Sequence, residues 1–211
     1  ELDGNEACDD GNVEDEDGCS ASCTIESGFA CSDDGCEEVA GIEVGEPYHP
    51  VGASFGLTEI VVADCPQGTL VGFAAEVNQA TGLRGIRGIC ADLEVDDGEL
   101  AWEESSMTSL LGSLSMSLVS SVCERDEVLI GMKIFYTAID IEGVAPICAK
   151  AEVSGGKLDL GSAVIRERVG NDGLQKLEAL CDPGSIAANR LAADPDPTGF
   201  GSLGMRCGSP E

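Results

Sequence analysis

Six cysteines recur at nearly constant spacing through the larger part of the chain. The first cysteine of each set follows the previous one after 58 residues, and the second follows the first after 25, 25 and 26 residues: Cys65 and Cys90, Cys123 and Cys148, Cys181 and Cys207. Flanking residues repeat in the same register, since Gly98-Glu99-Leu100 returns 58 residues later as Gly156-Lys157-Leu158. Such agreement is typical of an internal repeat. We therefore predict three copies, over roughly 40–95, 96–153 and 154–211.

Each predicted copy has the composition of β structure. The runs 70–77 and 128–136 are rich in β-branched and aromatic residues and are bounded by turn-forming residues. The segment 174–180 also has a local helical pattern, but the matching segments of the other copies are rich in Thr, Ser and Val. We therefore predict a strand there as well.

Three β units of this length, with about four strands each, can close around a pseudo-threefold axis. Closure removes exposed sheet edges, which would otherwise pair with other chains. We predict an all-β fold over residues 39–211 that is closed around a pseudo-threefold axis. A β-trefoil is the less favoured alternative, because trefoil repeats are usually shorter.

Residues 1–38 have a different chemistry and form a separate predicted domain, which is small, rich in loops and stapled by disulfides. They hold five cysteines and 14 acidic residues but no Lys or Arg. A segment this small and this charged cannot build an apolar core. Disulfides, a bound metal or both must hold it together. The pairing of its cysteines stays open: Cys8, Cys19, Cys23, Cys31 and Cys36.

The charge of the chain excludes several classes of partner. With 40 acidic and 11 basic residues the net charge is −29, so binding to nucleic-acid phosphates is excluded. Docking on an anionic membrane is excluded for the same reason. No apolar run approaches the roughly 18 residues that span a bilayer, which argues against membrane insertion. The regular cysteines predict an oxidising, extracellular or cell-surface location.

The body resembles the vitelline membrane outer layer protein family. The matching residues are Cys65-Pro66-Gln67-Gly68, Gly72-Phe73, and Gly85-Ile86-Arg87 ahead of Cys90. The second copy departs from this pattern with Glu124-Arg125-Asp126, and the third lacks the Gly-Phe pair. The resemblance implies a three-sheet β-prism with one disulfide within each copy: Cys65–Cys90, Cys123–Cys148 and Cys181–Cys207.

The N-terminal part resembles the Myxococcus-type cysteine-rich repeat of secreted bacterial proteins. The matching segments are 4–12, 17–23 and 28–31, with Glu16 where that family usually has Gly. The family normally has a further cysteine upstream of Gly4, which leaves an odd number here. The unmatched cysteine then pairs either with a segment upstream of this sequence or with another subunit.

Oxygen-bearing side chains crowd the loop between Cys8 and Cys19. Hard oxygen donors in a crosslinked loop suit Ca²⁺, which takes 6–8 oxygen ligands and tolerates irregular geometry. An ion would also relieve the repulsion among the carboxylates and complete the fold. The alternative is a solvated acidic loop held only by disulfides. The predicted calcium ligands are Glu6, Asp9, Asp10, Asn12, Asp15 and Asp17.

The remaining chemistry-bearing residues do not predict an enzyme. His49 lies in a Tyr-His-Pro turn, which suits a turn better than acid–base catalysis. Glu103 and Glu104 are adjacent and would point to opposite faces of a strand, unlike a glycosidase pair. Trp102 beside them either contacts a sugar ring or is a rim or core residue.

Together these features predict a secreted, non-enzymatic interaction or structural protein. It would be a component of a cell surface or of an assembled fibre, with Ca²⁺ as its bound ion. Its expected partners are further copies of itself, other surface proteins or a glycan. The alternative function is that of a carbohydrate-binding lectin of the β-prism type, and a hydrolase is the least favoured third interpretation.

Overall fold

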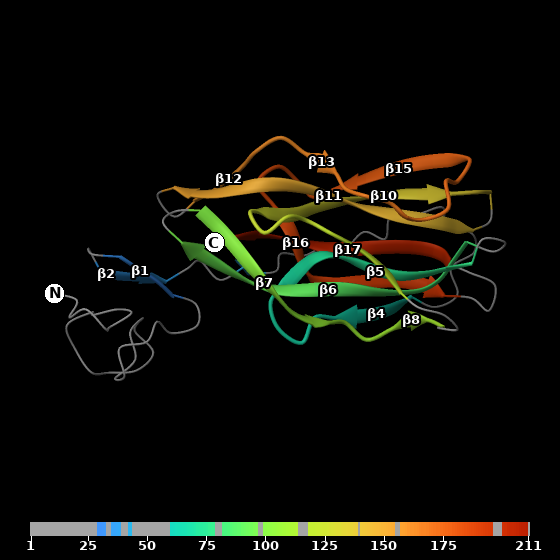
Figure 1. The fold of residues 1–211 in the computed structure, drawn as a ribbon, viewed down its shortest axis with the longest axis horizontal. Helices are drawn as coiled ribbons and strands as arrows, with labels where there is room; N and C mark the ends of the chain where they lie inside the picture. Colours follow the sequence, from blue (N-terminus) through green and yellow to red (C-terminus); the bar gives the residue numbers. More distant parts are fainter. Residues whose placement is uncertain are drawn as a thin grey trace.

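The computed structural model describes residues 29–32, 35–38, 42–43, 60–78, 82–96, 99–113, 118–138, 140–154, 157–195 and 200–210. Every regular element in these ranges is a strand, so the fold is all-β as predicted (Figure 1). None of the described residues forms a helix that could cross a membrane. The strands are β1 Phe29–Ser32, β2 Gly35–Glu38, β3 Ile42–Glu43, β4 Val61–Asp64, β5 Thr69–Asn78, β6 Gly82–Asp96, β7 Glu99–Met107, β8 Leu111–Gly112, β9 Val119–Val122, β10 Glu127–Tyr136, β11 Ile141–Ser154, β12 Lys157–Leu160, β13 Val164–Ile165, β14 Val169–Gly170, β15 Gln175–Leu180, β16 Ile186–Pro195 and β17 Phe200–Pro210.

Three long antiparallel hairpins, β5–β6, β10–β11 and β16–β17, each form the centre of a group of strands, called here the first, second and third sheets. One residue pair, Glu152 of β11 with Glu99 of β7, joins the first two groups into a continuous 11-stranded sheet. In the first sheet β9 pairs with β5, while β7 and β8 pair with β6. In the second sheet β15 pairs with β10, while β12, β13 and β14 pair with β11. In the third sheet β4 pairs with β16 and β3 pairs with β17. Predicted strands 70–77, 128–136 and 174–180 correspond to β5, β10 and β15.

The sheets are offset from the sequence copies. The strand that precedes the first cysteine of each copy completes the sheet of the copy before it, so β9 joins the first hairpin and β15 the second. By the same rule β4, which precedes Cys65, joins the third hairpin and closes the ring. The three copies therefore cannot fold as independent units, because each sheet takes a strand from its neighbour.

Backbone hydrogen bonds repeat with the same symmetry. The N–H of each first cysteine donates to a carbonyl on the first hairpin strand of the preceding sheet. The three bonds are Cys65 N to Asn189 O at 2.7 Å, Cys123 N to Val71 O at 2.9 Å and Cys181 N to Ile130 O at 2.9 Å. This regularity confirms the pseudo-threefold repeat.

Three disulfides join the sheets to one another. They are Cys65–Cys90, Cys123–Cys148 and Cys181–Cys207, with Cα–Cα distances of 5.8, 5.6 and 5.6 Å, ordinary values for such bonds. Each first cysteine follows the last strand of one sheet, and each second cysteine lies in the hairpin of the next. One crosslink therefore clamps each of the three junctions of the prism.

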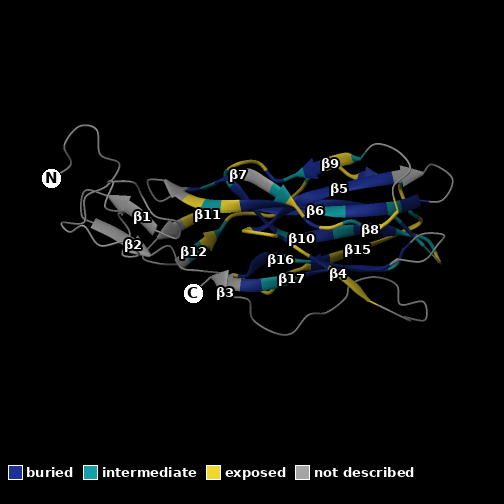
Figure 2. Cartoon of the chain, turned by 90° about the horizontal axis from the view of Figure 1, so that it is seen from below, coloured by how far each residue is buried: buried dark blue, intermediate teal, exposed yellow. Residues whose placement is uncertain are grey.

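Side chains from all three sheets meet in one hydrophobic core. Phe73 of β5, Met132 of β10 and Phe200 of β17 are fully buried within it. Figure 2 shows buried residues along the hairpin strands and exposed residues toward turns and edge strands. Burial of each such side chain stabilises the fold by about 1.5–3 kcal/mol, so the shared core is a second reason why the copies depend on one another.

Arg190 in the third sheet takes the position that glycine has in the first two sheets, Gly72 and Gly131. In the first two sheets the hairpin passes so close to its edge strand that a Cβ on Gly72 would lie 2.4 Å from the Ser121 carbonyl oxygen, and one on Gly131 would lie 2.6 Å from that of Ala179. In the third sheet Arg190 lies opposite Asp64, at an irregularity between Ala187 and Leu191. The irregular backbone there admits a side chain where the regular strands do not.

Arg190 and Asp64 form a two-pronged ion pair. The Nε and Nη2 atoms of Arg190 donate to Oδ1 and Oδ2 of Asp64 at 2.5 and 3.0 Å. The hydrogen bond from Arg190 lowers the pKa of Asp64 below its ordinary value of 3.8, despite an opposing effect of partial burial. A carboxylate with a lowered pKa stabilises the folded state above its unfolded pKa, and this contribution is lost as the pH falls through the lowered value.

We expect Arg190→Ala to reduce the free energy of unfolding by about 0.5 kcal/mol at neutral pH, because both side chains are more than a third exposed. The difference from the wild-type protein should disappear in acid well below pH 3.8, where Asp64 is protonated in both proteins. Urea unfolding at neutral and at strongly acidic pH measures it. A difference that stays the same size in acid would contradict the assignment.

Candidate functional site

The loop after Cys123 is where the second copy differs chemically from the other two. It carries Glu124-Arg125-Asp126, whereas the first copy has Pro66-Gln67-Gly68 and the third has Asp182-Pro183-Gly184. The backbone turn is shared, since Glu127 N donates to Glu124 O at 2.9 Å and Ser185 N donates to Asp182 O at 2.9 Å. The same turn therefore presents a set of charged groups in the second copy alone.

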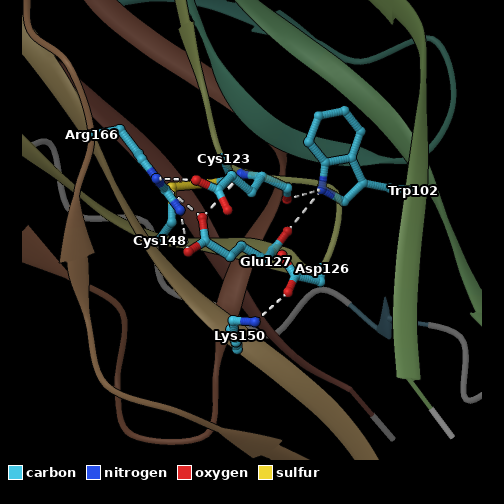
Figure 3. Close-up of polar contacts among 8 residues, drawn as sticks. Trp102, Cys123, Asp126, Glu127, Cys148, Lys150 and Arg166 are labelled. Atoms are coloured by element: carbon cyan, nitrogen blue, oxygen red, sulfur yellow. Dashed lines mark hydrogen bonds and ion pairs between the residues drawn. A yellow bond between two sulfur atoms is a disulfide. The ribbon is translucent and has the colours of Figure 1, made fainter.

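A buried carboxylate lies at the centre of this loop (Figure 3). The side chain of Glu127 is only 3% exposed. Its Oε2 accepts hydrogen bonds from Arg166 Nε and from the Glu124 backbone N–H, both at 3.0 Å, while Arg166 Nη2 contacts Oε1. Arg166 Nη1 also reaches Glu124 Oε1 at 2.5 Å. These contacts, with Glu127 the largest, raise the pKa of Arg166, so the guanidinium stays charged.

Arg166 comes from the segment between β13 and β14, whose backbone lies along β11. Its N–H donates to the carbonyl of Pro146 at 2.9 Å. The equivalent bond in the first sheet runs from Thr108 N to Gly88 O at 3.0 Å. The fold therefore places a side chain beside the cysteine loop at this position, and the second sheet has an arginine there.

Trp102 on β7 supports the same loop from the other side (Figure 3). Its side chain belongs to the hydrophobic core, and the residue is 6% exposed. Its Nε1–H donates to the carbonyl oxygens of Glu124 at 2.9 Å and Glu127 at 2.8 Å. The structure corrects the idea that Trp102 contacts a sugar ring, because the ring is covered and its polar atom is already bonded. Trp102 is instead a core residue, which was the other interpretation of the sequence.

An ion pair links the loop to the neighbouring strand. Lys150 Nζ on β11 lies 2.5 Å from Asp126 Oδ2, with 68% and 46% of the two side chains exposed. The hydrogen bond from Lys150 lowers the pKa of Asp126 and, reciprocally, raises that of Lys150. Lys150 is therefore charged. One ion pair with Asp126 positions its ammonium group, and most of its side chain contacts solvent.

An open groove of ≈ 310 Å³ begins at this lysine. Glu152 and Asp159 are directly opposite each other in the antiparallel β11–β12 pair, and both are exposed. Like charges directly opposite across two strands are unfavourable. Their juxtaposition at a groove marks the groove as a candidate binding site. The lining residues are Lys150, Glu152, Asp159, Leu160 and Gly161.

A metal site is not formed by the residues around the second disulfide. Among the described residues, ligand atoms of Cys123, Glu127 and Cys148 lie within 4.8 Å of one another. The two cysteines are bonded to each other, so neither offers a thiolate, and Glu127 is already bonded to Arg166. This cluster is therefore a crosslink beside an ion pair.

The predicted calcium ligands Glu6, Asp9, Asp10, Asn12, Asp15 and Asp17 lie outside the described residues. The same holds for Cys8, Cys19 and Cys23, and for most of the segments that resemble the Myxococcus-type repeat. Strands β1 and β2 pair with Cys31 opposite Cys36.

No sequence motif predicted roles for Arg166, Glu127 or the groove residues. A signal was present, because Glu124-Arg125-Asp126 departs from the Pro-x-Gly pattern of the first copy. That departure indicated the loop but not its partners, since Arg166 is 39 residues from Glu127. Glu152 and Asp159 become neighbours only when β11 pairs with β12.

The described residues thus define an all-β protein of β-prism architecture with a polar groove beside its second disulfide. No protein-family model matches the chain, and no curated protein matches it. A crystal structure of a prostate-specific WGA16 glycoprotein lectin, form II, is similar to it at 13% identity and a TM-score of 0.49, over 76% of this chain and 99% of that one. Calystegia sepium agglutinin is similar at 8% identity and a TM-score of 0.47, over 77% of this chain and 98% of that one.

Proposed function

We propose that the protein is a secreted, non-enzymatic carbohydrate-binding protein that holds a neutral glycan in the groove between β11 and β12. The observation that carries this proposal is the open groove of ≈ 310 Å³ lined by one lysine and two opposed carboxylates. Glycan binding was the alternative function predicted from the sequence, and the groove favours it over a purely structural role.

The groove has the donors and acceptors that a sugar ring requires. Ionised carboxylates only accept hydrogen bonds and an ammonium only donates them, so Glu152 and Asp159 suit hydroxyl donors and Lys150 suits a hydroxyl or ring oxygen. A sugar hydroxyl placed between Glu152 and Asp159 would donate a hydrogen bond to one carboxylate. It would also reduce the repulsion between the two negative charges. Leu160, which is half-buried, offers apolar contact to the C–H face of a ring.

Electrostatics select among glycans. The chain carries a net charge of −29, and the groove residues include two acids and one base. A field of one sign repels ligands of the same sign. We therefore expect neutral or amino sugars to bind and sialylated or sulfated ones to be rejected.

A disulfide and backbone hydrogen bonds anchor the base of the groove. Strand β11 carries Cys148 of the second disulfide and accepts the backbone bond from Arg166. Lys150 and Glu152 follow on the same strand, and Gly161 N donates to Lys150 O at 2.8 Å. A site on fixed strands loses little entropy when a ligand binds.

We expect Glu152→Gln and Asp159→Asn each to weaken binding of a neutral oligosaccharide by roughly tenfold, which corresponds to one charge-assisted hydrogen bond. A glycan array identifies the ligand, and calorimetric titration of that ligand measures the change. Glu94→Gln is the matched control, because Glu94 is an exposed acid on β6 outside the groove. Failure of the wild-type protein to bind any neutral glycan, or equal effects of Glu94→Gln and Glu152→Gln, would reject the proposal.

The calcium site of residues 1–38 remains a proposal. Its support is the crowding of oxygen donors between Cys8 and Cys19. Titration calorimetry with Ca²⁺ and thermal melting in chelator test it. Secretion is supported by the three disulfides, because such bonds persist mainly in oxidising compartments.

A further inference from the structure

The edge of the second sheet exposes apolar side chains. Within the described residues β15 pairs with β10 alone and lies at the end of the sheet. The exposed fraction is 89% for Leu174, 36% for Leu177 and 56% for Leu180. Leu177 and Leu180 lie on β15 and Leu174 directly precedes it, and exposed leucines on an edge strand favour pairing with another strand. The residue sequence of β15 indicates which strand could pair with it.

The segment Leu174-Gln175-Lys176-Leu177-Glu178-Ala179-Leu180 is complementary to itself when reversed. An antiparallel copy centred on Leu177 would place Lys176 opposite Glu178 of the partner subunit and Leu174 opposite Leu180 of the partner subunit. Lys176, Glu178 and Leu180 differ by even numbers, so they share one face of β15. Leu174 continues the same spacing at the residue before the strand. Two ion pairs flanked by two leucine pairs would then cross the junction.

Glu178 and Lys176 already form ion pairs within their own chain. Glu178 Oε1 lies 2.7 Å from Lys133 Nζ on β10, and the Glu178 side chain is 48% exposed. Lys176 lies 3.3 Å from Asp172 and is 50% exposed. Pairing would place Glu178 between Lys133 and Lys176 of the partner subunit. Charges of alternating sign would therefore continue across the junction.

The equivalent edge strands of the other two sheets, β9 and β4, lack this complementarity. Strands β9 and β4 have four residues each, Val119–Val122 and Val61–Asp64, against six in β15. Neither contains residues of both charges, and Asp64 is already bonded to Arg190. A charge on an edge strand normally discourages pairing because an identical copy presents the same charge. In β15 the antiparallel copy presents the opposite one.

We propose that two copies of the chain associate through antiparallel pairing of β15 with its counterpart, forming a continuous sheet across a twofold axis. This association is independent of glycan binding. It gives a physical basis to the self-association predicted from the sequence, and it is isologous, so it produces closed dimers.

Sedimentation velocity of the full chain at physiological ionic strength tests the proposal. The expected result is a reversible equilibrium between the 21.7 kDa monomer and a dimer of twice that mass. Leu174→Asp should raise the dissociation constant of the dimer by at least about tenfold, because it places a carboxylate against a leucine. Val119→Asp is the matched control on β9, where Val119 is 58% exposed, and it should leave the equilibrium unchanged.

A charge exchange provides a second test. Glu178→Lys places lysine opposite Lys176 of the partner subunit and should weaken the dimer. The double variant Lys176→Glu/Glu178→Lys should restore part of the lost affinity, because the exchanged residues still face Lys133 and Asp172 of their own chain. Circular dichroism verifies that each variant is folded, and SDS gels without reductant identify any covalent dimer. A wild-type chain that is monomeric at all concentrations, a dimer that survives SDS, or a double variant no better than Glu178→Lys would overturn the proposal.

Discussion

Replacing Arg166 with Met is expected to lower the free energy of unfolding by roughly 2–4 kcal/mol. The reason is the carboxylate that the substitution leaves behind. Glu127 is 3% exposed, and without Arg166 it keeps the Glu124 N–H but loses its charged partner. A buried charge without a counterion retains its desolvation penalty, which is why removing one partner costs more than the pair contributes.

The same logic predicts recovery in a double variant. Glu127→Gln in the Arg166→Met background removes the stranded charge, and we expect it to restore at least about half of the lost stability. Arg125→Met is the control, since Arg125 lies in the same loop but is exposed, and we expect a change within about 0.5 kcal/mol. Urea unfolding followed by Trp102 fluorescence measures all three. A loss in Arg166→Met no larger than in Arg125→Met would contradict a structural role for the pair.

Removing the second disulfide with Cys123→Ala/Cys148→Ala is expected to lower the free energy of unfolding by about 3 kcal/mol. The crosslink closes a loop over a separation of 25 residues, so its loss increases the entropy of the unfolded chain. It also releases the clamp between the first and second sheets, because Cys123 follows β9 and Cys148 lies in β11.

Trp102 gives this experiment a local readout. It is the only tryptophan in the chain, and it donates hydrogen bonds to carbonyls of the loop after Cys123. We expect its emission to shift toward that of exposed indole at a lower urea concentration in the double variant than in the wild-type protein. Cys65→Ala/Cys90→Ala, which opens a different junction, serves for comparison. An unchanged urea midpoint without Cys123–Cys148 would show that the core alone holds the junction.

Much of the fold could be predicted from the sequence because it rests on local patterns. The cysteine spacing showed three copies, and the β-branched runs of residues 70–77 and 128–136 predicted the strands that became β5 and β10. The strand at 174–180 was inferred by comparing copies, although its own pattern also suited a helix. The disulfide pairing came from the family resemblance and is the one observed.

The candidate site could not be predicted in the same way. Glu127 and Trp102 have no sequence signature of burial, and Glu152 and Asp159 are seven positions apart. Their roles depend on which strand lies beside which, and β-strand pairing joins segments that are distant in the sequence. Trp102 was considered for sugar contact because an exposed and a buried tryptophan look identical in a sequence.

By itself the sequence determined the repeat, the kind of secondary structure and the positions of the crosslinked residues, because alternation along a strand and spacing between copies are local properties. Only the tertiary structure decided that each copy completes the sheet of the one before it, with β4 closing the ring. It also decided which charges are buried and which line a groove. Those outcomes depend on closure of the prism, which brings residues of different copies to the same junction and removes water from between them.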